Sequence, residues 1–564
     1  MPKYIPFPPI GLPDRKWPNQ TILAAPTWCS VDLRDGNQAL INPMGPAKKL
    51  DLFRTLVKIG FKEIEVGFPA ASETDFQFVR ELIHRKLIPD DVTIQVLVQS
   101  RSQLIDRTFE ALRGAKSAIV HLYNSTSTLQ RRVVFNASKS EIVQLAVDGA
   151  KRIHELAQGE HASGSVRYEY SPESFTGTEI DFAVEICQAV CDIWKPTPAN
   201  KAIMNLPSTV ELATPNVYAD QIELFCRKFP ARKSTYVSLH THNDRGTGIA
   251  ASELGLLAGA ERVEGTLFGN GERTGNLDIV TMALNMTTQG INSGLDFSNL
   301  KEIRRIAEFC TELRVHERTP YAGDLVFTAF SGSHQDAIKK GFAAMKDSDQ
   351  ELFEVPYLTI DPADIGRQYD PVIRVNSQSG KGGVAFLIES ELGFQLPRRL
   401  QIAFSQIIQK ITDATGREIP AHEVAAKFME VYVRPVETLT YHSHTPIDCS
   451  DEEQERYRFA VTFRGQNSEI LGQGAGPLDA LVHALQEAYG LSCDVLDYHE
   501  HAMEAGSDST AVAFILSRTN GGQELFGVGQ HRSITKASLL GLVTSINRSL
   551  VSRHNQGQFV QDAL

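Results

Sequence analysis

The sequence predicts an α/β protein whose first half is a closed (β/α)8 barrel, a TIM barrel. One pattern recurs eight times between Thr27 and about Gln289: a short β-branched run ends in polar or glycine residues, and an amphipathic helix follows. An open doubly wound sheet is the alternative fold. That fold would place a G-x-G-x-x-G turn after the first strand, where this chain has Arg34-Asp35-Gly36-Asn37-Gln38. The repeat therefore favours the closed barrel.

The expected barrel strands are short apolar segments that end in polar residues. They comprise residues 27–33, 64–67, 93–98, 118–122, 166–170, 202–206, 236–239 and 262–268. Helices are expected between them, for example over residues 46–59 and from about Glu73. Active sites of such barrels lie at the carboxyl ends of the strands, so the polar residues that end each strand are the candidate functional residues.

The second half of the chain loses this alternation. Helical segments over residues 300–313 and 331–344 lie among glycine- and proline-rich turns, which predicts a helical connecting subdomain. From about Pro435 a weak internal repeat follows, in which a strand, a G-x-G sequence and a helix occur twice, with the helices over 477–489 and 533–550. This pattern predicts a C-terminal α+β domain. It suits a small-molecule pocket between the copies and a dimerisation module equally well.

The expected domain organisation is an N-terminal arm over residues 1–26, the barrel over 27–310, the connecting subdomain over 311–434 and the C-terminal domain over 435–564. A chain of 564 residues with 42% hydrophobic and 22% charged residues is typical of a globular enzyme with several domains. Its net charge of −12 argues against a nucleic-acid partner. The proline-rich arm has no apolar run long enough for a signal or membrane segment, and the seven scattered cysteines fit a reducing compartment. We therefore expect a cytoplasmic protein.

Two histidines at the end of the seventh strand are the strongest candidate functional residues. His240 and His242 are two positions apart, so both imidazoles face the same side of a strand. An isolated H-x-H could equally be one core and one surface histidine. In a closed barrel, however, the eighth strand pairs with the first, which brings Asp35 and Asn276 to the same place. Two imidazoles, a carboxylate and an amide oxygen suit Mg²⁺, Mn²⁺ or Zn²⁺.

Other polar residues are expected at the same mouth. Arg34 would stabilise negative charge that develops on a substrate oxygen, unless it only forms a structural salt bridge. Glu173 ends the fifth strand and is the candidate base or electrostatic group within the barrel. His121 and Thr209 end the fourth and sixth strands, where they can hold a substrate carboxylate.

His334 and Tyr369 lie outside the expected barrel. They would contribute to the chemistry only if the connecting subdomain folds over the mouth.

Several stretches resemble the signature segments of the 2-isopropylmalate synthases and, more widely, of the acetyl-CoA-dependent Claisen-condensing barrels. They are Asp32-Leu33-Arg34-Asp35-Gly36, His240-Thr241-His242-Asn243-Asp244 and Gly269-Asn270-Gly271-Glu272-Arg273-Thr274-Gly275-Asn276. The resemblance extends through residues 320–324 and 331–336 into the C-terminal third, and it is strongest to the longer type with an N-terminal arm.

The resemblance implies an acyltransferase. Such an enzyme condenses acetyl-CoA with 3-methyl-2-oxobutanoate, giving (2S)-2-isopropylmalate and CoA in the first committed step of leucine synthesis, and leucine inhibits it. A divalent metal is implied, Mg²⁺ before Mn²⁺ or Zn²⁺, with acetyl-CoA as co-substrate and room for activation by K⁺. A homodimer is also implied.

The implied roles transfer residue by residue. Asp35, His240, His242 and Asn276 match metal ligands, and Arg34 matches a catalytic arginine. Glu173, His121 and Thr209 match substrate-contacting positions, while His334 and Tyr369 match base-side residues that the partner subunit contributes. The C-terminal domain resembles a leucine-binding regulatory domain, in which the pocket positions are Gly476, Leu478, Val495, Tyr498, Ala502 and Ile534.

Other functions remain open at this point. A sister synthase that forms homocitrate or citramalate, or a lyase that cleaves the same type of carbon–carbon bond, would share the metal motif. A metal-dependent hydrolase is less favoured, because barrel hydrolases commonly carry H-x-H on the first strand and this chain carries it on the seventh. A non-catalytic amino-acid sensor would not need the intact ligand set.

Overall fold

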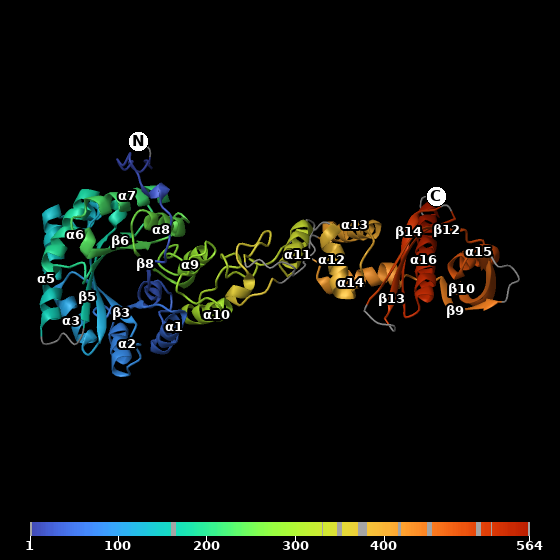
Figure 1. Ribbon diagram of the computed structural model, residues 1–564, viewed down its shortest axis with the longest axis horizontal. Helices are drawn as coiled ribbons and strands as arrows, with labels where there is room; N and C mark the ends of the chain where they lie inside the picture. The colour runs from blue at the N-terminus through green and yellow to red at the C-terminus, as the bar shows by residue number, and fades with distance from the viewer. Residues whose placement is uncertain are drawn as a thin grey trace. The chain divides into compact units, whose positions relative to one another are not determined.

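The computed structural model describes residues 3–159, 165–329, 331–346, 352–369, 381–415, 419–447, 454–503, 509–520 and 522–561. Its internal contacts divide the chain into two compact units (Figure 1). The first comprises Met1–Phe327 with Thr359–Tyr369, and the second comprises Thr328–Leu358 with Asp370–Leu564.

The first unit is a closed barrel of parallel strands in sequence order. The strands are β1 (Thr27–Ser30), β2 (Glu63–Gly67), β3 (Thr93–Gln99), β4 (Ser117–Ser125), β5 (Ser165–Glu173), β6 (Ala202–Ser208), β7 (Thr235–Thr241) and β8 (Arg262–Gly265). β8 pairs in parallel with β1, with Glu264 opposite Cys29, and this pairing closes the barrel. The predicted barrel is therefore confirmed.

Helices surround the strands, as Figure 1 shows. They are α1 (Pro46–Ile59), α2 (Glu73–His84), α3 (Ser102–Leu112), α5 (Lys139–Gln158), α6 (Ile180–Trp194), α7 (Pro215–Lys228), α8 (Gly248–Leu257), α9 (Ile279–Thr287) and α10 (Leu300–Thr311), with the short α4 (Thr128–Gln130) before α5. Local signals set their ends. α1 has a proline at its first position and is followed by Gly60 in the left-handed conformation, with φ of 113°.

Two barrel strands end earlier than the sequence predicts. β1 was expected to reach Leu33, but the chain leaves the sheet after Ser30 and forms a π-helical turn, η2 (Asp32–Gly36). β8 ends at Gly265 instead of Phe268 and is followed by η6 (Leu267–Gly269). The reason is the buried carboxylate of Asp32, which accepts hydrogen bonds from Ser30 Oγ at 2.8 Å and from the Leu267 amide at 3.0 Å. These bonds tie the two turns together.

The second unit begins with helices and ends with two similar sheets. The helices are α11 (Gly332–Lys346), α12 (Lys381–Leu392), α13 (Arg398–Thr415) and α14 (Ala421–Phe428), which continues into η8 (Met429–Val433). One antiparallel sheet has the order β11-β10-β9, from β9 (Leu439–Ile447), β10 (Glu455–Phe463) and β11 (Gln466–Gly474), followed by α15 (Pro477–Tyr489). The other has the order β12-β13-β14, from β12 (Cys493–Ala502), β13 (Ala511–Thr519) and β14 (Glu524–His531), followed by α16 (Ile534–Gln561). Three strands and a helix thus occur twice, as the internal repeat indicates.

One hydrophobic core joins the helices of the second unit to its second sheet. Phe404 and Phe428, from α13 and α14, are buried together with Phe514 of β13 and Phe526 of β14. Aromatic rings meet edge to face in this core, for example Phe394 and Phe514 with centroids 6.4 Å apart. The helical segment is therefore packed directly on the repeat module.

Within the described part of the chain, no helix has the length and apolar character needed to cross a bilayer.

Candidate active site

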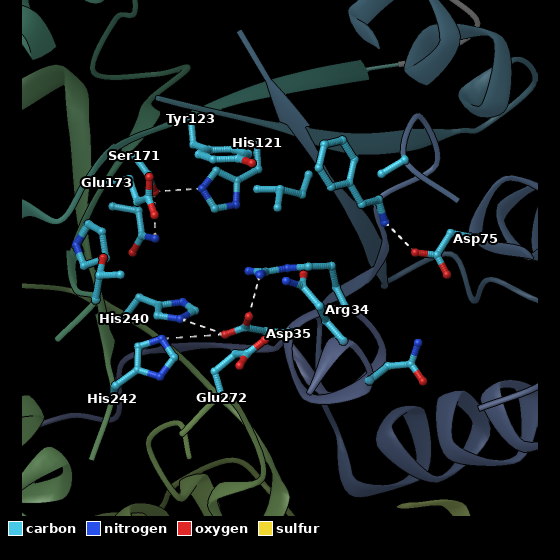
Figure 2. Close-up of a pocket in the computed structure, with 18 of the residues that line it drawn as sticks. Arg34, Asp35, Asp75, His121, Tyr123, Ser171, Glu173, His240, His242 and Glu272 are labelled. Atoms are coloured by element: carbon cyan, nitrogen blue, oxygen red, sulfur yellow. Dashed lines mark hydrogen bonds and ion pairs between the residues drawn. The ribbon is translucent and has the colours of Figure 1, made fainter. Parts of the chain in front are cut away.

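A cavity of about 630 Å³ opens where the barrel strands end (Figure 2). This volume is in the usual range for small-molecule sites. Its lining brings together seven of the residues predicted from the sequence, namely Arg34, Asp35, His121, Glu173, Thr209, His240 and His242.

Three of the predicted metal ligands converge at one side of this cavity. Asp35 lies in η2, whereas His240 and His242 lie at the end of β7, and all three side chains are buried. Asp35 Oδ2 is 3.2 Å from His240 Nε2 and 3.9 Å from His242 Nε2. One potential ligand atom from each residue lies within 4.8 Å of the others. The three residues are therefore close enough to share one cation.

Asn276, the fourth predicted ligand, is brought beside His242 by the loop that follows β8. The backbones of the two residues form an isolated antiparallel bridge. The Asn276 amide nitrogen donates to the Asn270 carbonyl at 3.0 Å, while its Oδ1 is buried and has no hydrogen-bond partner among the described residues. Gly271 permits this placement, because a Cβ there would lie 2.2 Å from Asn276 Nδ2.

The electrostatics of this cluster fit a divalent cation. Burial alone would lower the pKa of His240, but hydrogen bonds to Asp35 and Glu264 raise it to about 9, which shows that positive charge is stabilised there. Burial and the neighbouring His240 lower the pKa of His242 to about 4, so His242 keeps the neutral form that metals bind. Burial opposes the charge of Asp35, but Arg34 and both histidines hold its pKa well below the usual range. The unpaired oxygen of Asn276 completes a set of donors suited to a cation.

Arg34 connects the candidate ligand Asp35 to the barrel interior. Its Nη1 donates to Asp35 Oδ1 at 2.7 Å, and its Nε donates to Glu65. The salt bridge that the sequence left as an alternative is therefore formed. Arg34 also lines the cavity, so its guanidinium can contact a ligand as well.

The other side of the cavity combines hydrogen-bonding groups with an apolar wall. His121 Nδ1 donates to Glu65 at 2.9 Å, and its Nε2 lies 2.7 Å from Ser171 Oγ. Glu173 accepts a hydrogen bond from Ser125 Oγ, and Thr209 Oγ1 accepts one from the Ser174 amide at 2.9 Å. The apolar lining comes from Pro43, Phe68, Ala71, Leu97, Tyr123 and Pro207.

His334 and Tyr369 are not among the described residues that line this cavity. His334 lies on α11 in the second unit, where its exposed ring stacks on Tyr357 with centroids 4.0 Å apart. Tyr369 belongs to the first unit and is partly buried. Their expected contribution from a partner subunit remains a prediction.

The residues predicted to bind leucine lie in the second unit, around the edge strand β12. Val495, Tyr498 and Ala502 are on β12, Gly476 and Leu478 are at the start of α15, and Ile534 begins α16. Both helices contact β12, and Tyr498 Oη lies 3.0 Å from Ser538 Oγ of α16. The side chains of Val495, Tyr498 and Ile534 are exposed, and their role in binding leucine remains a prediction.

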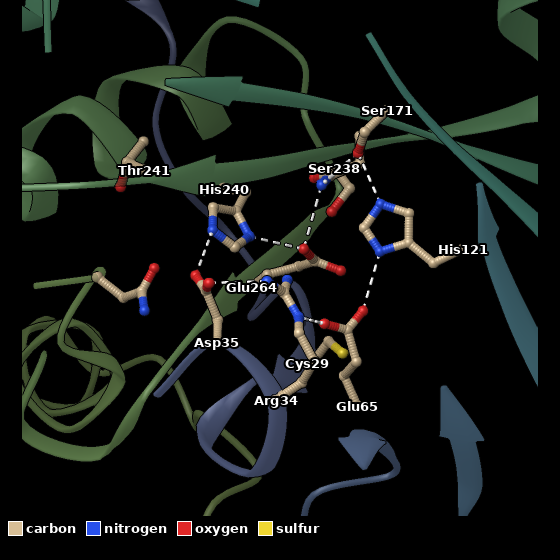
Figure 3. Close-up of polar contacts among 12 residues, drawn as sticks. Cys29, Arg34, Asp35, Glu65, His121, Ser171, Ser238, His240, Thr241 and Glu264 are labelled. Atoms are coloured by element: carbon tan, nitrogen blue, oxygen red, sulfur yellow. Dashed lines mark hydrogen bonds and ion pairs between the residues drawn. The ribbon is translucent and has the colours of Figure 1, made fainter. Parts of the chain in front are cut away.

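Three buried polar residues beneath the cavity were not singled out from the sequence. Figure 3 shows two of them, Glu65 and Glu264, in contact with His121 and His240. The third, Gln95, donates to both carboxylates, at 2.6 Å to Glu65 and 2.9 Å to Glu264. The available signal was an ionisable or amide residue inside a buried strand, because such a residue must find partners within the barrel.

Comparisons with known proteins cover almost the whole chain. Residues 25–307 match a family described as HMGL-like, residues 324–389 match the "Alpha-isopropylmalate synthase, post-catalytic domain-like" family, and residues 418–550 match the "LeuA allosteric (dimerisation) domain". A 2-isopropylmalate synthase of Rhodospirillum rubrum is 57% identical over 97% of this chain and 98% of that protein. A 2-isopropylmalate synthase of Mesorhizobium japonicum is 54% identical over the same shares of the two chains.

These matches are near full length and have high identity, and they agree with the barrel, its cluster of ligands and the repeated C-terminal module. The chain belongs to the 2-isopropylmalate synthase family.

Proposed function

We propose that this protein condenses acetyl-CoA with 3-methyl-2-oxobutanoate and water, giving (2S)-2-isopropylmalate and free CoA, and that leucine inhibits it. The observation that carries the proposal is the convergence of Asp35, His240, His242 and Asn276 beside Arg34 at one barrel mouth. Family membership supports the same reaction.

The two sides of the cavity suit the two ends of a 2-oxo acid. Asp35, His240, His242 and Asn276 would hold a divalent cation, Mg²⁺ before Mn²⁺ or Zn²⁺, which when bound acts as a Lewis acid toward the keto group. The hydroxyl groups of Ser171 and Thr209 and the imidazole of His121 can orient the carboxylate. Leu97 and Pro207 offer an apolar surface to an isopropyl group.

Condensation requires a base, an electrophile and a site for developing negative charge. A base removes a proton from the acetyl methyl group, and the resulting enolate carbon forms a bond to the keto carbon. Glu173 is the candidate base within the barrel, with His334 and Tyr369 of a partner subunit as further candidates. The Arg34 guanidinium can stabilise the oxygen that becomes negative, which then takes up a proton. Water finally cleaves the thioester and releases the CoA thiol and a second carboxylate.

Thiol release with a panel of 2-oxo acids tests this function. We expect 3-methyl-2-oxobutanoate to be used far better than pyruvate or 2-oxoglutarate, because the apolar side of the cavity suits a branched alkyl group. His242→Ala should lower CoA release by more than about 100-fold, since loss of even an outer partner of a metal-bound histidine costs 10- to 100-fold. The exposed His316→Ala is the matched control and should retain activity. A preference for pyruvate or 2-oxoglutarate would assign a sister synthase instead, and normal turnover by His242→Ala would reject the metal site.

Leucine inhibition is tested separately with the exposed residues of the second unit. Ile534→Ala should weaken inhibition of CoA release by leucine several-fold and leave the uninhibited rate unchanged. Leu471→Ala is the matched control, because its side chain is 50% exposed against 55% for Ile534 and it is not one of the predicted pocket residues. Equal leucine sensitivity of the two variants would contradict the predicted pocket.

A further inference from the structure

We propose that Glu264 is a positioning residue for the metal site, which orients His240 and determines which of its ring nitrogens faces the cation. This inference rests on the metal site of the proposed function. It concerns a residue that is buried below the cavity and does not line it.

Glu264 is held from several directions at once. It lies on β8, is fully buried, and its Oε2 accepts hydrogen bonds from His240 Nδ1 at 2.8 Å and Asn205 Nδ2 at 3.1 Å. Its Oε1 accepts from Arg262 Nη1 at 2.8 Å and Gln95 Nε2 at 2.9 Å. These donors come from β7, β6, β8 and β3. A carboxylate with four such donors has a fixed orientation.

This fixed carboxylate assigns the protons of His240. An ionised carboxylate only accepts hydrogen bonds, so His240 Nδ1 must carry a proton. Nε2 then points the other way, toward Asp35 Oδ2 at 3.2 Å. In the neutral imidazole the lone pair is therefore on Nε2, where a shared cation would bind.

The same hydrogen bonds form a closed ring around the floor of the cavity, most of which can be followed in Figure 3. Arg34 forms ion pairs with both Asp35 and Glu65. Gln95 Nε2 donates to Glu65 and to Glu264 and so links the two glutamates. Glu264 contacts His240, and His240 Nε2 faces Asp35, which closes the ring. Two metal ligands from distant parts of the sequence are thus held by one connected set of side chains. Removal of the acceptor at Glu264 opens this ring at the histidine.

A second buried glutamate, Glu63, serves as a control that separates positioning of His240 by Glu264 from a merely structural role of a buried glutamate. Glu63 also lies in the barrel interior, is 4% exposed, and accepts from Arg262 Nε at 2.6 Å. Within the described part of the chain, Glu63 pairs with Arg262 and Arg167, does not contact His240 and does not line the cavity. A change at Glu63 therefore disturbs the same arginine without touching a metal ligand.

The test is titration of the purified full-length protein with Mn²⁺ alone, by calorimetry and by the electron paramagnetic resonance of free Mn²⁺. Glu264→Gln should weaken Mn²⁺ binding by about 10- to 100-fold, as expected when an outer partner of a metal-bound histidine is lost. The glutamine side chain has a single acceptor oxygen. We expect this oxygen to stay with the charged Arg262 guanidinium, so that the amide nitrogen faces His240 Nδ1 and cannot accept its hydrogen bond. Glu63→Gln should bind Mn²⁺ like the wild type.

Wild-type Mn²⁺ affinity in Glu264→Gln would overturn the inference, as would an equal loss of affinity in Glu63→Gln. If Glu264→Gln does not fold, Glu264→Asp provides the test, because it keeps the charge but withdraws the carboxylate by one methylene. A loss of Mn²⁺ affinity in Glu264→Asp would support the inference, and unchanged affinity would overturn it. No thioester is used, so this result is separate from the success or failure of the CoA-release assay.

Discussion

Ionisable side chains inside the barrel are the residues that give this molecule its chemistry. Burying a charge is costly unless it is paired, and the barrel interior meets this condition with ion pairs, such as Arg262 with Glu63 and with Glu264. Removing one partner from such a pair leaves an uncompensated charge. The interior of the barrel is therefore sensitive to single substitutions well below the cavity.

Asp32 should make the stability of the barrel depend on pH. Burial raises the pKa of Asp32 to about 7, although Ser30 and the Leu267 amide donate hydrogen bonds to it, whereas an exposed aspartate has a pKa of about 3.9. The folded protein thus holds this proton more tightly than the unfolded chain. Its stabilising contribution is fully present below about pH 4 and is lost as the pH rises through about 7.

Asp32→Asn removes this titration. The advantage in thermal midpoint of the wild type over Asp32→Asn should therefore be larger at about pH 5 than at about pH 8, as measured by circular dichroism. The exposed Asp51→Asn is the control for the loss of one carboxylate, and Asp32→Asn should change the pH dependence of the thermal midpoint more than this variant does. A pH-independent difference for Asp32→Asn would show that this carboxyl does not titrate in the folded protein.

At the level of single elements, features set by local sequence signals were predicted, whereas several features set by contacts between distant residues were missed. The expected helix over residues 46–59 coincides with α1, because its proline start and glycine end are local signals. The early ends of β1 and β8 were missed, because the bond from Asp32 to Leu267 joins residues far apart in the sequence. The proximity of the candidate metal ligands was predicted because each lies at or beyond the end of a strand, and barrel closure places strand ends together. Glu65, Gln95 and Glu264 were not, because their sequence neighbours do not reveal their partners on other strands.

The G-x-G sequences of the internal repeat have a shared physical role. They lie on β11 and β14, each of which packs against the helix that follows it. A Cβ on Gly472 would lie 2.0 Å from the carbonyl oxygen of Ala480 in α15, and a Cβ on Gly529 would lie 2.0 Å from that of Ala537 in α16. The strand and helix backbones can approach this closely only without a side chain.

Gly472→Ala should therefore destabilise the second unit by about 1–3 kcal/mol, the usual cost of overpacking. The midpoint of the urea-induced unfolding transition, followed by circular dichroism, should shift to a lower urea concentration. The midpoint followed by tryptophan fluorescence should not shift, because all three tryptophans lie in the first unit. Gly476→Ala is the matched control, since a Cβ there meets no atom within 4 Å. Equal transitions for the two variants would contradict the close approach.

For the whole molecule, the match to a dimerisation domain leads to a prediction about which residues each subunit of a dimer contributes to a site. The cavity of the first unit is lined by the predicted metal ligands Asp35, His240 and His242, while the exposed His334 belongs to the second unit. The match to a dimerisation domain indicates a dimer. If the partner's His334 completes the site, each active centre needs an intact barrel from one subunit and an intact His334 from the other.

Mixed dimers test this arrangement. His242→Ala and His334→Ala homodimers should each be nearly inactive. A random mixture of the two subunits should recover about one quarter of the wild-type rate of CoA release, because half of the dimers are mixed and each has one intact site. A mixture no more active than its parents would mean that each subunit supplies both residues to its own site.

The core that α13 and α14 share with β13 and β14 has a consequence for how this protein can be divided. A chain that ends near residue 435 would lack β13 and β14, and the side chains of Phe404 and Phe428 would become exposed to water. The boundary that the sequence suggests near residue 435 therefore runs through a shared hydrophobic core. The helices cannot be exchanged between relatives without the sheet on which they pack. For the same reason, a shift of β13 or β14 acts directly on α13 and α14, because their side chains pack in the same core.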